Sequence, residues 1–392
     1  MAGVFDMRSD RCPRRLSLCG IGMAVALGCG PSPAAGGQKP EPVTLHWLDG
    51  SAPAVTQGVS WGVPWPQGRL AVKDGLVLQA ADGQDVPLQT WPLAYWPDGS
   101  LKWSGHAIGA GPALGSTLTL SVGRAEPPAV RVSVKQTEAG TDVDTGALRC
   151  HLARSGSDFI DTLSVGERVV ARGARLVALR EDRSGIADGG GVREEELVGE
   201  VRSVTVEQSG PVRAVVKVEG VHRATHGERT WLPFVVRLYF FAGQDSVRLV
   251  HSFVFDGDPE QDFIKGLGIA FGVPLREERH NRHVRLGGDT GIWAEPVQPL
   301  VGRRVVMLPG GGEAFPPQLA GRRVPDLKDF AERDQAYLRA AADWDDYRLT
   351  QLTPNGFAIE KRTGPAVAWV RAGDGRRTLG VAFLGDVSGG LA

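Results

Sequence analysis

The chain is predicted to be an all-β protein, with a small β-barrel followed by a large antiparallel β-sandwich. Short valine-rich runs alternate with turn residues, and its 53 glycines and 26 prolines make up about a fifth of the 392 residues. In most of these runs the apolar residues recur with the two-residue period of a strand. Only residues 327–347 carry a helical pattern. Many short strands separated by turns favour sheets packed on sheets.

Residues 1–42 are predicted to be a targeting segment and tether that takes no part in the fold. A basic stretch (residues 8–15) precedes an apolar run (residues 16–27), which is the pattern of an export signal. Cys29 follows in Ala-Leu-Gly-Cys, which resembles a bacterial lipoprotein box, so we expect Cys29 to be lipidated. The protein is then an outer-membrane or cell-surface lipoprotein. The alternative is a cleaved signal peptide that gives a periplasmic or extracellular protein.

Residues 43–138 are predicted to form the barrel, because short strands follow one another at close spacing. Seven strands are expected, at residues 43–48, 58–63, 70–78, 86–91, 101–108, 117–122 and 129–134. A stretch rich in Thr, Gly and Asp (residues 135–146) indicates the boundary with the next domain.

Residues 139–392 are predicted to form the sandwich. Its clearest hairpin joins residues 231–241 to residues 247–255, and the first of these runs is apolar on both faces, which is typical of a central strand. A polar loop is expected around His222 and His226. Residues 182–196 are charged and glycine-rich, which predicts a surface loop.

The composition argues against several classes of function. The 44 basic and 45 acidic residues nearly cancel, whereas a nucleic-acid-binding domain is usually basic. Three of the four cysteines lie in residues 1–42, so Cys150, expected in a buried strand, has no partner for an internal disulfide. The spacing of Cys and His predicts no metal site, and no nucleotide-binding motif is present. We therefore expect no cofactor, and membrane contact only through the lipid anchor.

Residues 91–106 (WPLAYWPDGSLKWSGH) carry five aromatic side chains around a Pro-Asp-Gly-Ser turn. Exposed indoles can stack on the apolar faces of sugar rings, and buried indoles fill cores. Both interpretations stay open for each residue. Trp96 and Trp103 are the candidates for substrate binding.

Several motifs resemble those of one family. They are residues 62–68 (GVPWPQG), 94–103 (AYWPDGSLKW), 263–268 (FIKGLG), 281–283 (NRH), 349–351 (LTQ) and 359–363 (IEKRT). Together they resemble the exo-acting rhamnogalacturonan lyases of polysaccharide lyase family twenty-six and their uncharacterised bacterial relatives, over nearly all of residues 43–390. The resemblance implies a RIFT barrel, a central β-sandwich and a C-terminal α/α toroid. The toroid is expected to begin where this sequence stops, so half of the family's cleft is expected to be absent.

β-Elimination at a uronic acid requires a cation to neutralise the carboxylate, a base for the C5 proton and an acid for the leaving oxygen. Lys265 is the predicted base, because it lies in an otherwise apolar, glycine-containing stretch and the resemblance points to a lysine there. A solvated lysine on a strand edge is the alternative.

Residues 279–283 (RHNRH) form a dense polar cluster. Arg282 is the candidate for carboxylate binding, because its planar guanidinium can bind a carboxylate through two hydrogen bonds. His283 or His280 is the candidate proton donor, and His280 and Asn281 are expected to contact substrate. An exposed polar loop is the alternative.

The sequence thus predicts an exported lyase that cleaves rhamnogalacturonan-type pectin, a polysaccharide or oligosaccharide, and that is partial as given. The alternative function is a surface lipoprotein that binds carbohydrate without catalysis. A third hypothesis is a scaffold of two β domains whose aromatic residues all belong to the core.

Overall fold

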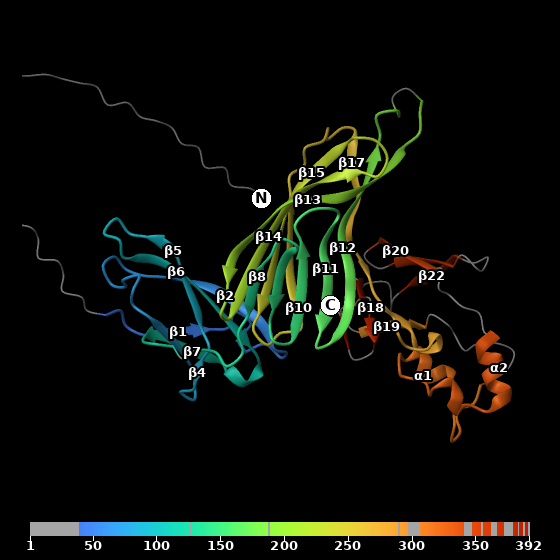
Figure 1. The fold of residues 1–392 in the computed structure, drawn as a ribbon, viewed down its shortest axis with the longest axis horizontal. Helices are drawn as coiled ribbons and strands as arrows, with labels where there is room; N and C mark the ends of the chain where they lie inside the picture. Colours follow the sequence, from blue (N-terminus) through green and yellow to red (C-terminus); the bar gives the residue numbers. More distant parts are fainter. Residues whose placement is uncertain are drawn as a thin grey trace, which may run out of the picture. The chain divides into compact units, whose positions relative to one another are not determined.

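The computed structural model (Figure 1) confirms an all-β fold. It describes residues 39–125, 127–186, 189–288, 291–296, 306–340, 347–353, 356–361, 367–371, 379–382, 384–386 and 389–390. Within this part of the chain, no helix is both long and apolar enough to span a membrane. Cys29 and the rest of the predicted targeting segment, up to residue 38, lie outside the described residues.

The N-terminal region contains two antiparallel sheets with strand orders β1-β7-β3-β4 and β2-β6-β5. The strands are β1 (Val43–His46), β2 (Gln57–Pro64), β3 (Leu76–Ala80), β4 (Asp85–Val86), β5 (Gln89–Tyr95), β6 (Leu101–Ala110) and β7 (Thr117–Val122), with the 3₁₀-helix η1 (Pro112–Leu114) between the last two. Alternate residues of β3 are buried, as the period of a strand requires. They pack with Leu70, Ile108 and Leu120, which are fully enclosed, in one core.

A turn positions the aromatic stretch between β5 and β6. Asp98 accepts hydrogen bonds from the backbone N–H of Ser100 (3.0 Å) and from its hydroxyl (2.6 Å). Gly99 has a φ of 82°, a conformation that glycine adopts without steric cost. The predicted turn is therefore present, and it sets Trp96 at the end of one strand and Trp103 on the next.

The central region is one ten-stranded antiparallel sheet that runs in the order β16-β15-β14-β13-β12-β11-β10-β9-β8, with β17 paired to β12. Figure 1 shows β12 and β17 side by side. The strands are β8 (Ser133–Gln136), β9 (Gly140–Asp144), β10 (Leu148–Ala153), β11 (Asp158–Val165), β12 (Arg168–Asp182), β13 (Arg193–Ser209), β14 (Arg213–Ala224), β15 (Thr230–Phe241), β16 (Val247–Phe253) and β17 (Asp262–Gly272).

The core of the central region is aliphatic and aromatic, with Phe159, Leu176 and Phe240 among its enclosed side chains. The predicted hairpin is present as β15 and β16, and β15 lies between β14 and β16 as a strand with two apolar faces should. Cys150 lies in β10 with 2% of its surface exposed, as predicted. Burial raises the pKa of its thiol.

Short segments and helices complete the described chain. They are the 3₁₀-helices η2 (Arg279–Asn281) and η3 (Leu327–Asp329), the helices α1 (Phe315–Leu319) and α2 (Glu332–Ala340), and the strands β18 (His283–Gly288), β19 (Gly291–Pro296), β20 (Tyr347–Thr353), β21 (Gly356–Lys361), β22 (Val367–Arg371), β23 (Leu379–Ala382), β24 (Leu384–Asp386) and β25 (Gly389–Gly390). A small core that includes Val324, Phe330 and Leu338 holds the helical part together.

Several sequence expectations differ from the structure, and three of them bear on the strands and on His222. The last strand expected in the barrel is β8, which pairs with β9 in the central sheet, because Val132 and Val134 pack on that sheet's core. The helical pattern predicted to reach residue 347 ends within the described residues at Ala340, and Tyr347 begins β20. His222 lies inside β14 and not in a loop. Its ring is fully buried, with Nδ1 2.8 Å from the carbonyl oxygen of Leu232.

Candidate functional site

A cleft lined by charged side chains lies where β12 ends and β13 begins, beside the turn that follows β14. Its volume is about 560 Å³. We call it the charged cleft, and its lining residues are Arg180, Asp182, Arg193, Glu194, Glu195, Glu196, Thr225, His226 and Arg229. Both cations and carboxylates line it, so it can contact both the carboxylate and the hydroxyl groups of an acidic sugar.

Arg180 is fixed beside this cleft by carboxylates from three segments. Its side chain is buried, and it pairs with Asp262 on β17, with Glu195 (3.2 Å) and with Asp182 (3.4 Å). Burial alone lowers the pKa of a guanidinium, but hydrogen bonding and attraction to Asp262, with the two further carboxylates, raise the pKa of Arg180. Arg180 is therefore committed to holding β12, β13 and β17 together.

Two further arginines have more freedom. Arg229 is 44% exposed and only loosely paired, with Nε 3.6 Å from Glu195 and Nη1 3.8 Å from Asp262. Arg193 is exposed and has no ion pair among the described residues. Each can turn its planar guanidinium toward a ligand carboxylate.

Lys265 lies at the rim of the charged cleft. It is near the start of β17, its side chain is 43% exposed, and its Nζ forms an ion pair with Glu194. Its neighbours Ile264 and Leu267 are each 37% exposed, so the stretch that looked apolar in sequence is half open to solvent. Because Glu194 is paired with Nζ of Lys265, a substrate can contact this amine only after the ion pair opens.

The polar cluster of residues 279–283 follows the other end of β17. Asn281 is buried and exchanges two hydrogen bonds with the backbone of Val324, at 2.8 and 2.6 Å. His280 has Nε2 3.1 Å from the carbonyl oxygen of Pro325. His283 has its ring nitrogens 2.9 Å from the carbonyl oxygens of Asn281 and Gln318. These contacts join the helical segment to the end of the sheet.

The low solvent exposure of this cluster argues against the alternative interpretation as an exposed polar loop. His280, Asn281 and His283 are each less than 9% exposed. Arg282 is half-buried, and its Nε donates to the carbonyl oxygen of Glu277 (2.8 Å). His280, Asn281 and His283 are therefore closed to a substrate in this structure, whereas Arg282 is partly accessible.

The structure does not bring Lys265 and this cluster together. Glu277 pairs with Arg168 at the first residue of β12 (3.6 Å), whereas Lys265 lies opposite the end of β12 near Arg180. Twelve residues separate Arg168 from Arg180, which corresponds to roughly 40 Å at the rise of an extended strand. The cations of residues 279–283 thus cannot act on Lys265.

The aromatic stretch of the barrel divides into buried and exposed members. Trp96 is half-buried, its Nε1 donates to the carbonyl oxygen of Trp65 (2.9 Å), and Lys102 lies 4.7 Å from its ring centre. Trp103 is 40% exposed and Leu93 56% exposed. A Cβ on Gly62 would be 3.6 Å from both side chains, so they lie side by side over this glycine. Trp103 is free to contact a ligand, and Trp96 fixes the turn.

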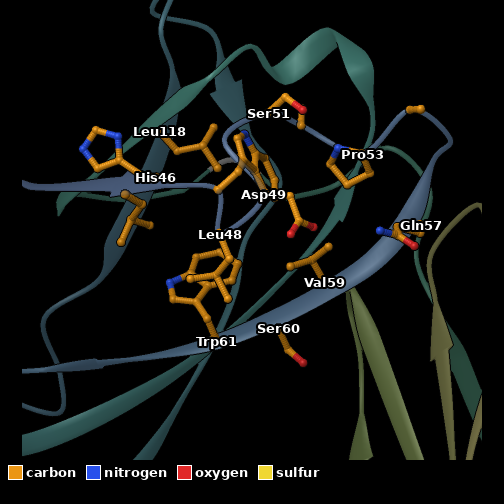
Figure 2. Close-up of a pocket in the computed structure, with 14 residues that line it drawn as sticks. His46, Leu48, Asp49, Ser51, Pro53, Gln57, Val59, Ser60, Trp61 and Leu118 are labelled. Atoms are coloured by element: carbon orange, nitrogen blue, oxygen red, sulfur yellow. The ribbon is translucent and has the colours of Figure 1, made fainter.

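A second cavity lies in the N-terminal region, between the loop after β1 and strand β2 (Figure 2). We call this cavity of about 560 Å³ the barrel pocket. It is walled by the indoles of Trp47 and Trp61, with Asp49, Ser60 and Gln57 among its polar residues. Trp47 is fixed by a hydrogen bond from Nε1 to the carbonyl oxygen of Gly115 (2.9 Å). Sequence reasoning missed this pocket. The sequence contains one indication of it, because Trp47 lies two residues before Asp49 in a loop.

The other side of Trp61 faces a buried histidine. The ring of His106 stacks on Trp61 at 5.4 Å, with Nε2 2.7 Å from the hydroxyl of Ser104 and Nδ1 3.1 Å from that of Thr90. Burial lowers the pKa of His106 to about 4. Nowhere among the described residues do three His, Cys, Asp or Glu side chains come together in a way that could hold a metal ion.

Comparison with known proteins gives two family matches and one curated relative. The model of the PcRGLX-like N-terminal RIFT barrel domain matches residues 41–123, and that of the PcRGLX-like protein central beta sandwich domain matches residues 132–392. An uncharacterized protein of Bacillus subtilis (strain 168), YetA, is 38% identical over 351 residues, which are 89% of this chain and 40% of that protein. The chain therefore spans about two fifths of the length of this relative.

Proposed function

Since the chain belongs to the PcRGLX-like family, we propose that it forms part of an exported lyase that cleaves rhamnogalacturonan-type pectin by β-elimination. The matches confirm the RIFT barrel, the central β-sandwich and the family predicted from the motifs. Export and lipidation of Cys29 are proposed from the basic and apolar pattern of residues 8–27.

The observation that carries the chemistry is the ion pair of Lys265 with Glu194, a residue that lines the charged cleft together with Arg193 and Arg229. In the proposed reaction Arg193 and Arg229 bind the uronate carboxylate, which makes the adjacent C5 proton more acidic. Lys265, released from Glu194, takes that proton, and the glycosidic bond to C4 breaks as the C4–C5 double bond forms. His226, which lines the same cleft, is placed to protonate the leaving oxygen.

The other predicted catalytic residues take no step in this proposal. Arg282 and His283 lie near the opposite end of β12, and His283 is buried against backbone carbonyl groups. His280 and Asn281 share that environment. Trp103, with its exposed indole, is kept as a substrate-binding residue, and Trp96 is expected to act through the shape of the turn.

Ultraviolet absorbance of the unsaturated uronate product tests the proposal on purified chain mixed with rhamnogalacturonan. We expect a steady rise with the native chain and its loss in Lys265→Ala. The matched control is Lys217→Ala, which removes another ion-paired lysine of the same sheet, held 3.0 Å from Glu219. An unchanged rate in Lys265→Ala would show that this residue is not the base. A folded chain that produces no rise would show that these 392 residues alone do not suffice for cleavage.

The barrel pocket favours a second candidate function, the binding of carbohydrate without catalysis. Its two indoles can contact the apolar faces of sugar rings, and Asp49, Ser60 and Gln57 can bond hydroxyl groups. Binding of neutral oligosaccharide by a chain that cleaves no pectin would establish this function in place of the first.

A further inference from the structure

Arg213, the first residue of β14, carries a buried charge that no carboxylate balances. Its exposed fraction is 6%, and its guanidinium carbon lies 4.1 Å from the ring centre of Trp91 and 5.6 Å from that of Tyr239. Nε and Nη2 donate to the side-chain oxygen of Gln208, at 3.0 and 2.6 Å. Among the described residues Arg213 forms no ion pair, and Nη1 has no hydrogen-bond partner.

A second guanidinium lies on the same tyrosine. Arg248 on β16 is exposed, its guanidinium carbon is 5.7 Å from the ring centre of Tyr239, and within the described structure it too has no carboxylate partner. Burial, together with the charge of Arg248, lowers the pKa of Arg213. Both guanidinium groups thus contact one ring, and among the described residues no carboxylate pairs with either of them.

The same fold shows how a buried arginine is normally balanced. Arg180, at 5% exposure, is surrounded by three carboxylates, whereas Arg213, at 6%, has a neutral amide and two aromatic rings. Buried charges are usually paired, because removing an ion from water is costly. Stacking on Trp91 and Tyr239 recovers part of this cost. It leaves Nη1 of Arg213 and the whole guanidinium of Arg248 available to an anion.

An apolar strip begins at this pair of cations. The indole of Trp91 lies directly over Gly105, where a Cβ would be 2.3 Å from its ring. Two residues before Gly105 on β6, on the same face, is the exposed side chain of Trp103. The exposed side chain of Leu93, at a bulge of β5, lies beside it over Gly62. At a strand's rise, this second pair lies about 7 Å from Trp91.

We propose that Arg213 and Arg248 bind the carboxylate of an acidic sugar unit, while Trp103 and Leu93 support the next ring of the same glycan. Each carboxylate oxygen accepts a hydrogen bond from one guanidinium, and no covalent bond changes. The site is separate from the charged cleft, whose residues it does not share. The inference rests on the proposed function only in the choice of a pectic glycan.

Calorimetric titration with a trimer of galacturonate tests the site, because this probe lacks the rhamnose of the proposed lyase substrate. The matched ligand is the fully methyl-esterified trimer, which keeps the rings and removes the charge. The variants are Arg248→Gln and Trp103→Phe. The control is Arg237→Gln, since Arg237 is a neighbouring arginine already paired with Glu207 at 2.8 Å. The indole N–H resonance that disappears in Trp103→Phe reports occupancy at this place.

We expect the free acid to bind and to shift the Trp103 resonance. Arg248→Gln is expected to weaken binding about tenfold or more, because a charge-assisted hydrogen bond is lost. Arg237→Gln should leave affinity within about twofold, and the ester should bind weakly or not at all. Equal affinity for acid and ester, or binding that Arg248→Gln leaves unchanged, would overturn the inference.

The two proposals fail differently. If pectin is not cleaved but the trimer still binds in an Arg248-dependent way, the given residues do not suffice for cleavage and the acidic-sugar site stands. If pectin is cleaved but the trimer does not shift the Trp103 resonance, the acidic-sugar site is wrong and the lyase proposal is supported. Lys265→Ala should abolish cleavage and leave trimer binding unchanged.

Discussion

Acidification should destabilise the folded chain through His106, and the size of the effect follows from the structure. The ring is fully buried between Trp61 and two hydroxyl groups, and among the described residues it has no carboxylate partner. A neutral imidazole suits these partners, and burial lowers its pKa to about 4. In the unfolded chain the pKa of a histidine is about 6.5.

The sign of the effect follows from which state binds the proton. Below about pH 6.5 the unfolded chain protonates His106 while the folded chain does not, so the free energy of unfolding falls as the pH drops toward about 4. The difference between a pKa of about 6.5 and one of about 4 corresponds to about 3.4 kcal/mol in total, of which about 2.5 kcal/mol is lost by about pH 4.5. Above about pH 6.5 this contribution is fully present.

Urea unfolding between about pH 7 and about pH 4.5 measures this loss, with His106→Gln as the comparison because glutamine keeps hydrogen-bonding groups and does not titrate. His222 and His251, whose pKa values are also lowered by burial, act in the same direction in both proteins. Their share therefore cancels in the difference. Equal pH dependence in the two proteins, or a ring resonance of His106 that titrates near pH 6.5, would refute the reasoning.

Three further outcomes are expected. Glu194→Gln frees Lys265 from its ion pair and should raise kcat/KM on pectin up to about fivefold, which corresponds to the free energy of an exposed ion pair. A kcat/KM below that of the native chain would contradict the idea that Glu194 competes with substrate for Lys265. Trp47→Ala should weaken binding of neutral oligosaccharide to the barrel pocket about tenfold in calorimetry, whereas Trp103→Ala should not, and the reverse order would refute the assignment. Cys150, buried in β10, should react with a thiol reagent only after denaturant is added, and prompt reaction of this thiol in the native chain would show that the strand opens.

Local patterns in the sequence predicted much of the fold. The strand Thr117–Val122 and the hairpin of β15 and β16 follow from alternation over a few residues, which a strand displays whatever surrounds it. The strand expected in the barrel at residues 129–134 is found at residues 133–136 in the central sheet, because membership of a sheet depends on the partner strand, β9, and on a distant core. His222 was predicted in a loop because its polar neighbours hide a strand that is 12 residues long.

The candidate sites could be predicted only in part, because their contacts join residues far apart in the chain. Lys265 was singled out from its own motif, but its partner Glu194 lies 71 positions earlier. Arg213 stood in an ordinary half-exposed strand pattern, and only the tertiary structure shows that it is enclosed by aromatic rings without an anion. Residues 279–283 looked like an active site because they are polar and dense, a property that they share with hydrogen-bonded joints inside proteins.

The length of β12 has a consequence for how such a chain can change in evolution. This strand of 15 residues carries Arg180 of the charged cleft near one end and Arg168, which meets Glu277, at the other. A single residue inserted between them would turn one end to the opposite face of the sheet. Either the cleft or the joint with the helical segment would then be lost. Substitutions can change each end of β12 separately, but insertions are tolerated only in the loops. Length variation among relatives should therefore be concentrated in the loops.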